Sequence, residues 1–275
     1  MKKVISTAEN AAAVVAAPSD EAPRPPLSLF DGVEAAACEV LGVASLRHRS
    51  ALHALGQLRE LPRGSVAAAL DRIAGNWEAC AEAGQGTVSS QNWRWWEPQS
   101  FIGTANRSLE VVLERAIVNA CVAAGRRDWS NQVPVASGVV RSSSERRRAI
   151  DLVEQVGEKY FAFIELKVAS DTPLYAAFEI IGYIGVWLLS RNGAHQTDLL
   201  KATRIDARVL APAEYYARYE LAALERLLNE ELKAYGARHG VELNFGFETL
   251  PQGITPLQSY RDAEIFGLLN GRQPL

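Results

Sequence analysis

Apolar residues recur at helical spacing through the first half of the chain. Residues three and four positions apart share one face of a helix, so this pattern predicts four helices. Ser65 stands where it can cap the third of them, and Gly125 directly follows the fourth. The predicted helices span residues 33–46, 51–61, 65–83 and 109–124.

The second half of the chain has the pattern of strands. Runs of branched and aromatic residues predict five strands, at 129–140, 149–156, 160–168, 203–210 and 241–248. Two helices separate the later strands: an almost wholly apolar one at 172–191 and a charged amphipathic one at 214–239. Between residues 105 and 250 the order is therefore helix, three strands, helix, strand, helix, strand, which is an α/β fold.

Composition divides the chain into four parts. Residues 1–26 are rich in alanine, proline and charge and are predicted to be a disordered leader. Residues 27–104 form a helical N-terminal region with a Trp-rich linker, residues 105–250 the α/β domain, and residues 251–275 a partly helical tail. The linker tryptophans Trp93, Trp95 and Trp96 either stack on nucleic-acid bases or pack between two parts of the chain, and we favour packing.

Charge and cysteine content narrow the class of protein. The formal net charge of -3 gives no global basic field, which counts against a protein that coats nucleic acid non-specifically. The cysteines Cys38, Cys80 and Cys121 are far apart and include no CxxC pair, so we expect no zinc site but reduced thiols and a cytoplasmic location. The longest apolar run, at 180–189, is too short to span a bilayer, so no membrane association is expected.

The predicted strands at 149–156 and 160–168 form a hairpin that brings two acidic residues together. If Gly157-Glu158-Lys159 is a three-residue loop, Val156 pairs with Tyr160 and Asp151 lies opposite Glu165, with Cβ atoms roughly 5 Å apart. A two-residue loop would instead place Asp151 opposite Ile164, on the other face. The prediction therefore depends on this register.

The same face of the hairpin carries aromatic residues and a lysine. Phe161 and Phe163 share it with Glu165 and Lys167, which indicates burial, and a buried charge is costly unless it is paired or binds a metal. Two opposed carboxylates repel each other, and a divalent cation with oxygen ligands relieves that repulsion. The alternative is a surface hairpin with solvated charges in a domain that needs no metal.

Asp151 followed by Glu165-Leu166-Lys167 resembles the catalytic motif of the PD-(D/E)xK, or restriction-endonuclease-like, nuclease superfamily. The resemblance covers about residues 105–250 and implies an αβββαβ core, with the N-terminal helical region outside it. It also implies a nuclease that uses Mg²⁺ or Mn²⁺ to hydrolyse DNA. Asp151 and Glu165 would be its metal ligands, and Lys167 would orient or help to deprotonate the attacking water.

Two further residues enter through this resemblance. In many of these enzymes the first core helix supplies another acidic residue near the metal, and Glu114 matches that element as a catalytic residue and metal ligand. The alternative is a surface glutamate paired with Arg107 or Arg115. Several branches carry Gln and then Tyr four residues on in the helix after the motif. Here Glu179 replaces the Gln, and its role stays open among support of the ligands, contact with metal-bound water, and a pair with Lys167.

Basic residues surround the loop that precedes Asp151. Arg141, Arg146, Arg147 and Arg148 are the densest positive charge in the chain and are predicted to bind the phosphate backbone, although a solvated loop without a ligand is the alternative. The basic stretch from Arg47 to Arg59 is interpreted as a solvated helix face. DNA is the expected partner, and a homodimer is a possible assembly. The alternative function is a catalytically inactive module of the same fold that binds nucleic acid or protein.

Overall fold

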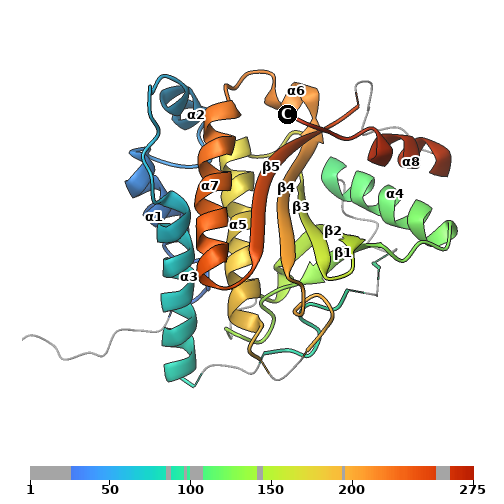
Figure 1. Cartoon of the computed structure of the whole chain (residues 1–275), viewed down its shortest axis with the longest axis horizontal. Helices are drawn as coiled ribbons and strands as arrows, with labels where there is room; N and C mark the ends of the chain where they lie inside the picture. The colour runs from blue at the N-terminus through green and yellow to red at the C-terminus, as the bar shows by residue number, and fades with distance from the viewer. Residues whose placement is uncertain are drawn as a thin grey trace, which may run out of the picture.

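A mixed six-stranded sheet with helices on both faces forms the centre of the protein in the computed structural model (Figure 1). The structure describes residues 26–84, 88–95, 98–99, 108–140, 145–193, 196–251 and 261–275. The predicted leader, apart from its last residue, lies outside the described residues. The α/β class predicted from the sequence is confirmed.

The strands follow one another across the sheet in chain order, β1-β2-β3-β4-β5-β6. The first three are antiparallel, β3, β4 and β5 are parallel, and the short β6 returns antiparallel to β5. A tight turn permits the antiparallel β2–β3 pair, whereas the parallel pairs need helical crossovers. The strands are β1 (Trp129–Pro134), β2 (Ala149–Gly157), β3 (Tyr160–Leu166), β4 (Arg204–Pro212), β5 (Glu242–Leu250) and β6 (Gln273–Pro274).

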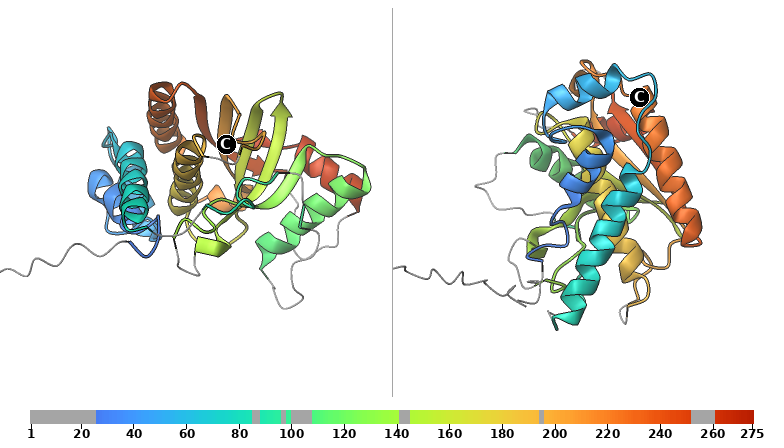
Figure 2. Two further views of the ribbon diagram at one scale, coloured as in Figure 1. Left: turned by 90° about the horizontal axis from the view of Figure 1, so that it is seen from below. Right: turned by 90° about the vertical axis from the view of Figure 1, so that its left-hand side faces the viewer.

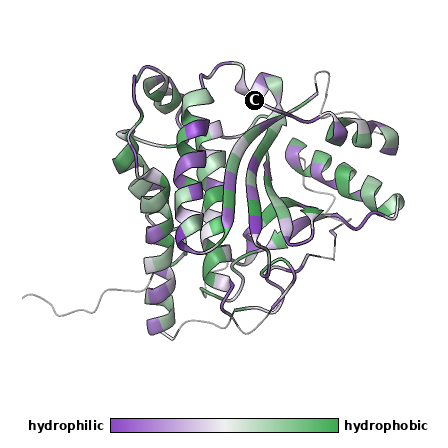
Figure 3. Cartoon of the chain, viewed as in Figure 1, coloured by the Kyte–Doolittle hydropathy of each residue, from purple (hydrophilic) through white to green (hydrophobic). Residues whose placement is uncertain are grey.

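Helices cover the two faces of the sheet in different ways (Figure 2). One face packs against the crossover helices α5 (Pro173–Ser190) and α7 (Ala222–Arg238), with the short α6 (Ala213–Tyr216) between β4 and α7. The other face packs against α4 (Leu109–Ala123) and α8 (Asp262–Asn270). Along α7 hydrophilic and hydrophobic residues alternate (Figure 3), as a helix with one solvated face requires.

The N-terminal helices form an outer layer over α5 and α7. They are α1 (Val33–Leu41), α2 (Arg49–Gly56) and α3 (Ser65–Glu82). Two glycines of α5 allow close approach: a Cβ built on Gly182 would lie 2.5 Å from Phe30, and one on Gly185 would lie 2.8 Å from Leu70. Because α5 is covered by the sheet on one side and by α3 on the other, it is apolar all round.

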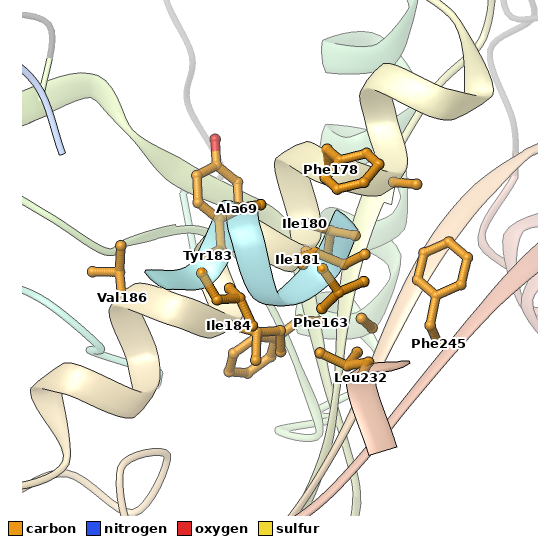
Figure 4. Packing of buried hydrophobic residues seen from close by; sticks show 14 of the residues in the cluster. Ala69, Phe163, Phe178, Ile180, Ile181, Tyr183, Ile184, Val186, Leu232 and Phe245 are labelled. Carbon is orange, nitrogen blue, oxygen red and sulfur yellow. The ribbon is translucent and has the colours of Figure 1, made fainter. Parts of the chain in front are cut away.

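One hydrophobic cluster joins this outer layer to the sheet (Figure 4). It includes Ala69 of α3, Phe163 of β3 and Phe245 of β5, which lie around the apolar residues of α5. Trp93 is fully buried and stacks on Phe163 with ring centroids 6.2 Å apart, and Trp95 packs edge-on against Phe161. The packing role favoured for these two tryptophans is confirmed, and Trp96 lies outside the described residues.

The order of elements from α4 to β5 is as predicted, with two corrections to their bounds. β1 ends at Pro134, well before residue 140. The N–H of Val135 still donates to the carbonyl of Arg148, and the chain then turns where the N–H of Val139 donates to the carbonyl of Ala136. The predicted helix at 214–239 is broken into α6 and α7, since the chain turns after Tyr216, whose hydroxyl donates to the carbonyl of Val209. One described helix, α5, is long and apolar enough to cross a bilayer, and it is packed inside the protein.

Candidate active site

The β2–β3 hairpin places Asp151 and Glu165 opposite each other. Leu152 pairs with Ile164 and Val153 with Phe163, and continuing this register by one residue pairs the two acids. The predicted three-residue loop is wrong, because Gly157 pairs with Tyr160 across a two-residue loop. A bulge between Gln155 and Gly157 adds one residue to β2 and restores the register on which the acid pair depends. The alternative with the two acids on opposite faces is thereby overturned.

Asp151 is partly exposed, and its carboxylate is anchored to the neighbouring strand. The backbone N–H of Leu166 donates to Asp151 Oδ2 at 3.0 Å. Burial raises the pKa of Asp151 to about 6, against the opposing effects of the Lys167 cation and the Leu166 N–H.

Glu165 and Lys167 are almost fully buried, with 4% and 7% of their surface exposed. Lys167 Nζ donates to Glu165 Oε1 at 2.7 Å and to Glu179 Oε2 of α5 at 3.2 Å. Burial, together with the charges of Asp151 and Glu179, raises the pKa of Glu165 well above its usual range. Of the roles left open for Glu179, the pair with Lys167 is the one this structure contains.

Glu114 projects from α4 into the side of the sheet and is 1% exposed. Both of its oxygens accept hydrogen bonds from amide groups of β1, one from Asn131 Nδ2 and one from Gln132 Nε2 at 2.9 Å. Burial and then the charge of Asp151 raise the pKa of Glu114 to about 7, despite these donors. The alternative of a surface glutamate is wrong for this residue, and its predicted role as a metal ligand stays a prediction.

Gln132 reaches Glu114 because its backbone departs from a regular strand. Neighbouring side chains of a strand point to opposite faces, yet both Asn131 and Gln132 donate to Glu114. Gln132 has φ of 47°, the left-handed region, and it occupies the β1 position between the residue pairs Asn131–Leu152 and Val133–Ile150, opposite Asp151. Strained backbone is maintained at sites where the surrounding structure holds it, often functional ones.

A second glutamate of α4, Glu110, holds the loop that follows the Glu-x-Lys strand. Its Oε1 accepts from the backbone N–H of Val168 at 3.2 Å and from the hydroxyl of Ser170 at 2.9 Å. Burial alone would raise the pKa of Glu110, but hydrogen bonds from Ser108, Ser170 and Val168 lower it to about 2. Glu110 therefore fixes the path of the chain directly after Lys167.

The four arginines predicted to bind phosphate differ in their surroundings. Arg141 lies outside the described residues, the side chain of Arg146 is not among those described, and Arg147 is exposed. Arg148 Nε lies 3.0 Å from Glu145 Oε1, and its guanidinium lies 4.0 Å from the centre of the Phe30 ring. Arg148 thus fastens the N-terminal segment to the sheet, and phosphate binding by this loop stays a prediction.

The residues present fit a divalent metal with few protein ligands. The carboxyl groups of Asp151, Glu165 and Glu179 share one neighbouring ammonium group, that of Lys167, so excess negative charge remains, and Glu114 interacts with the charge of Asp151. Within the described part of the chain, no three or more His, Cys, Asp or Glu residues form a group that could hold a metal ion. Mg²⁺ is commonly held by one or two carboxylates with water and substrate phosphate, and the Asp151–Glu165 pair supplies such donors.

Sequence reasoning missed the amide groups of Asn131 and Gln132 as supports of Glu114. The available indication was two polar amides in an otherwise apolar strand, but the left-handed backbone at Gln132 is not visible in the pattern. It also considered Glu110, one helical turn before Glu114, only as a weaker candidate for the acidic residue near the metal, and it did not predict the contacts of Glu110 with the loop after Lys167. No family model, curated protein or solved structure matches this chain.

Proposed function

We propose that this protein is a divalent-metal-dependent nuclease that hydrolyses phosphodiester bonds in DNA, built on a restriction-endonuclease-like αβββαβ core. The observation that carries the proposal is the opposition of Asp151 and Glu165 across the β2–β3 hairpin, with Lys167 directly beyond on the same face. The order of elements from α4 to β5 supports the same core.

The charge balance of the cluster favours the binding of a cation. Lys167 offsets one negative charge, through its contacts with Glu165 and Glu179. The carboxylate of Asp151 accepts a hydrogen bond from the backbone N–H of Leu166. A buried carboxylate without a full set of partners is costly, so binding of a cation between Asp151 and Glu165 would stabilise the ionised state of both.

In the proposed reaction, Asp151 and Glu165 would hold Mg²⁺ or Mn²⁺. When bound, such an ion lowers the pKa of water and neutralises negative charge at the phosphate. Lys167 contributes an ammonium group that donates a hydrogen bond to the attacking water or to a phosphate oxygen. Glu114 lies on the α4 side of the sheet, where its charge adds to the negative potential around Asp151.

The test is DNA cleavage by the purified full chain, with supercoiled plasmid and with single-stranded oligonucleotides, in Mg²⁺, Mn²⁺ or EDTA. The variants are Asp151→Asn, Glu165→Gln and Lys167→Ala, and the matched control is Glu158→Gln, which removes an exposed carboxylate from the turn of the same hairpin. We expect a loss of about 100-fold or more in each site variant, because each removes charge from the reacting centre.

Cleavage that requires metal, persists in Glu158→Gln and disappears in the three site variants would support the assignment. Equal metal-dependent cleavage by the three site variants would refute it. DNA binding without cleavage under any of these conditions would instead indicate the inactive nucleic-acid-binding module.

A further inference from the structure

A pocket of about 240 Å³ opens directly beyond the Glu-x-Lys strand. Three segments that are far apart in the sequence form it: the start of α2, the loop from Val168 to Asp171, and α6 together with Arg218 and Tyr219. The side chains that matter here are those of Arg49, Asp171, Glu214, Tyr215, Arg218 and Tyr219.

The pocket adjoins the candidate active site through the chain itself. Its wall contains Val168, which directly follows Lys167, and Glu110 of α4 holds that wall through the backbone N–H of Val168 and the hydroxyl of Ser170. Tyr215 on α6 is close enough to the site for its pKa to respond to the charges of Lys167 and Glu165. A ligand in the pocket would therefore lie next to the reacting group.

The pocket wall contains two arginines and two acids, and one of the acids is already paired with a residue outside the wall. Arg49 and Arg218 are exposed, and neither has an ion-pair partner among the described residues. The carboxylate of Asp171 is already offset by Arg47, whose Nη1 lies 2.7 Å from Asp171 Oδ1. Arg47 lies outside the pocket wall and also contacts Glu34, at 3.7 Å. Within the wall, Glu214 is therefore the remaining acid beside the two guanidinium groups of Arg49 and Arg218.

Arg49 occupies a position that does not favour the fold. It is the first residue of α2, where the partial positive charge of the helix N-terminus repels a cation. Its removal should therefore cost the helix nothing. An exposed arginine that weakens its own helix and has no ion-pair partner in the described structure is available for an anion from solution.

Two tyrosines of the pocket, Tyr219 and Tyr215, offer a ligand an aromatic ring and a hydroxyl group. The hydroxyl of Tyr215 is buried and has no hydrogen-bond partner among the described residues. Buried polar groups are normally paired, so this hydroxyl points to a missing partner. Tyr219 is partly exposed at the pocket, and its ring packs at 6.0 Å from that of His53.

We propose that this pocket is the subsite for one unpaired nucleotide of the DNA strand, next to the bond that is cut. Arg49 and Arg218 bind its phosphate, Tyr219 stacks on its base, and the hydroxyl of Tyr215 donates to a phosphate or sugar oxygen. Arginine suits phosphate through paired hydrogen bonds, and bases stack on aromatic rings when they are unpaired. The inference rests on the proposed nuclease function, since it places the substrate strand beside Lys167.

The test measures binding apart from cleavage. Fluorescence anisotropy of the full chain with a labelled single-stranded DNA and with its blunt duplex is recorded in EDTA. The double variant Arg49→Ala/Arg218→Ala is compared with Arg59→Ala/Arg226→Ala, which removes the same charge from two exposed arginines lining a different pocket. We expect the first variant to bind the single strand at least about 10-fold more weakly than the second, with a smaller effect on the duplex.

Two single variants complete the test. Glu214→Gln should bind the single strand more tightly than the unmodified protein, because it removes the unpaired acid of the pocket. Tyr215→Phe should keep its thermal stability, since the hydroxyl has no partner in the described structure, yet weaken single-strand binding. These outcomes do not depend on a loss of folding.

The two proposals fail separately. Equal binding by the two double variants, or equal weakening toward single strand and duplex, would overturn the subsite even if the protein cuts DNA. A protein that never cuts but loses single-strand binding only in the Arg49/Arg218 variant would refute the nuclease and support the pocket as a binding site.

Discussion

Replacing Glu114 by glutamine should remove a pH-dependent cost from the fold. Glu114 is buried between α4 and β1, and its pKa of about 7 compares with an ordinary value of 4.5. That difference corresponds to about 3 kcal/mol between the ionised and protonated forms. Glutamine has nearly the same shape and no charge, and it can exchange hydrogen bonds with the amide of Gln132 if that amide turns over.

The direction of the change in stability with pH depends on whether the folded or the unfolded chain holds the Glu114 proton. Between about pH 4.5 and pH 7 the folded protein keeps the Glu114 proton while the unfolded chain has lost it. The contribution of this group to stability is therefore largest at low pH, falls as pH rises through that window, and is constant above it. The Gln variant lacks this contribution at every pH.

Urea unfolding in EDTA across this range measures the effect. The free energy of unfolding of the unmodified protein, relative to Glu114→Gln, should fall by about 3 kcal/mol from pH 4 to pH 8. Glu158→Gln, at the exposed hairpin turn, is the control and should run parallel to the unmodified protein.

Mn²⁺ gives this experiment a second arm. If a cation binds beside Glu114, Mn²⁺ should stabilise the unmodified protein more at pH 8 than at pH 5, because protons compete for the same oxygens. The variant should show a smaller gain. Parallel stability curves for the unmodified protein and Glu114→Gln in EDTA would refute the reasoning, since they would mean that this carboxyl is not held at a raised pKa.

Two further predictions concern the parts of the fold that position the site. Glu110→Ala should lower the free energy of unfolding by about 2 kcal/mol at neutral pH, because the lowered pKa of Glu110 stabilises the fold above pH 4.5 and this contribution disappears as pH falls toward 2. Urea unfolding at several pH values measures the loss, and a loss that is the same at every pH would contradict the prediction. Gly182→Val should destabilise the protein by about 1–3 kcal/mol, because the added side chain forces α5 away from Phe30. Gly75→Ala in α3, where a Cβ meets open space, is the control and should be neutral or stabilising. Equal thermal midpoints for the two variants would contradict this packing.

The local pattern of apolar and polar residues was sufficient to predict the helices and strands and to assign side chains to the two faces of the hairpin. Phe161, Phe163 and Glu165 alternate with aliphatic residues, and this period fixes which side chains lie together. The loop was predicted with one residue too many, and the bulge at the end of β2 compensates. A bulge leaves little trace in composition, because Val156 is as apolar as a paired strand residue even though it is 48% exposed.

Contacts between distant segments were beyond the pattern. The stretch around Arg49 has the composition of a solvated helix face, and only the packing of the N-terminal layer on α5 brings it to the loop after Lys167. Similarly, Glu114 acquires its amide partners because β1 lies beside α4 and Gln132 adopts a left-handed backbone. Both facts depend on tertiary structure.

Glu179, which stands where the nuclease superfamily proposed for this chain often has a glutamine, bears on what Lys167 can do. Burial by itself would lower the pKa of Lys167, but the carboxylates of Glu165 and Glu179, at 2.7 and 3.2 Å, hold it above its usual range. If Glu165 turned toward a metal, Glu179 would still hold the ammonium form. An amine that stays protonated donates hydrogen bonds and positive charge but does not remove a proton from water. In the proposed nuclease, Lys167 would therefore act as a cation that orients water and stabilises charge at phosphorus, and it would not be the base that deprotonates the water.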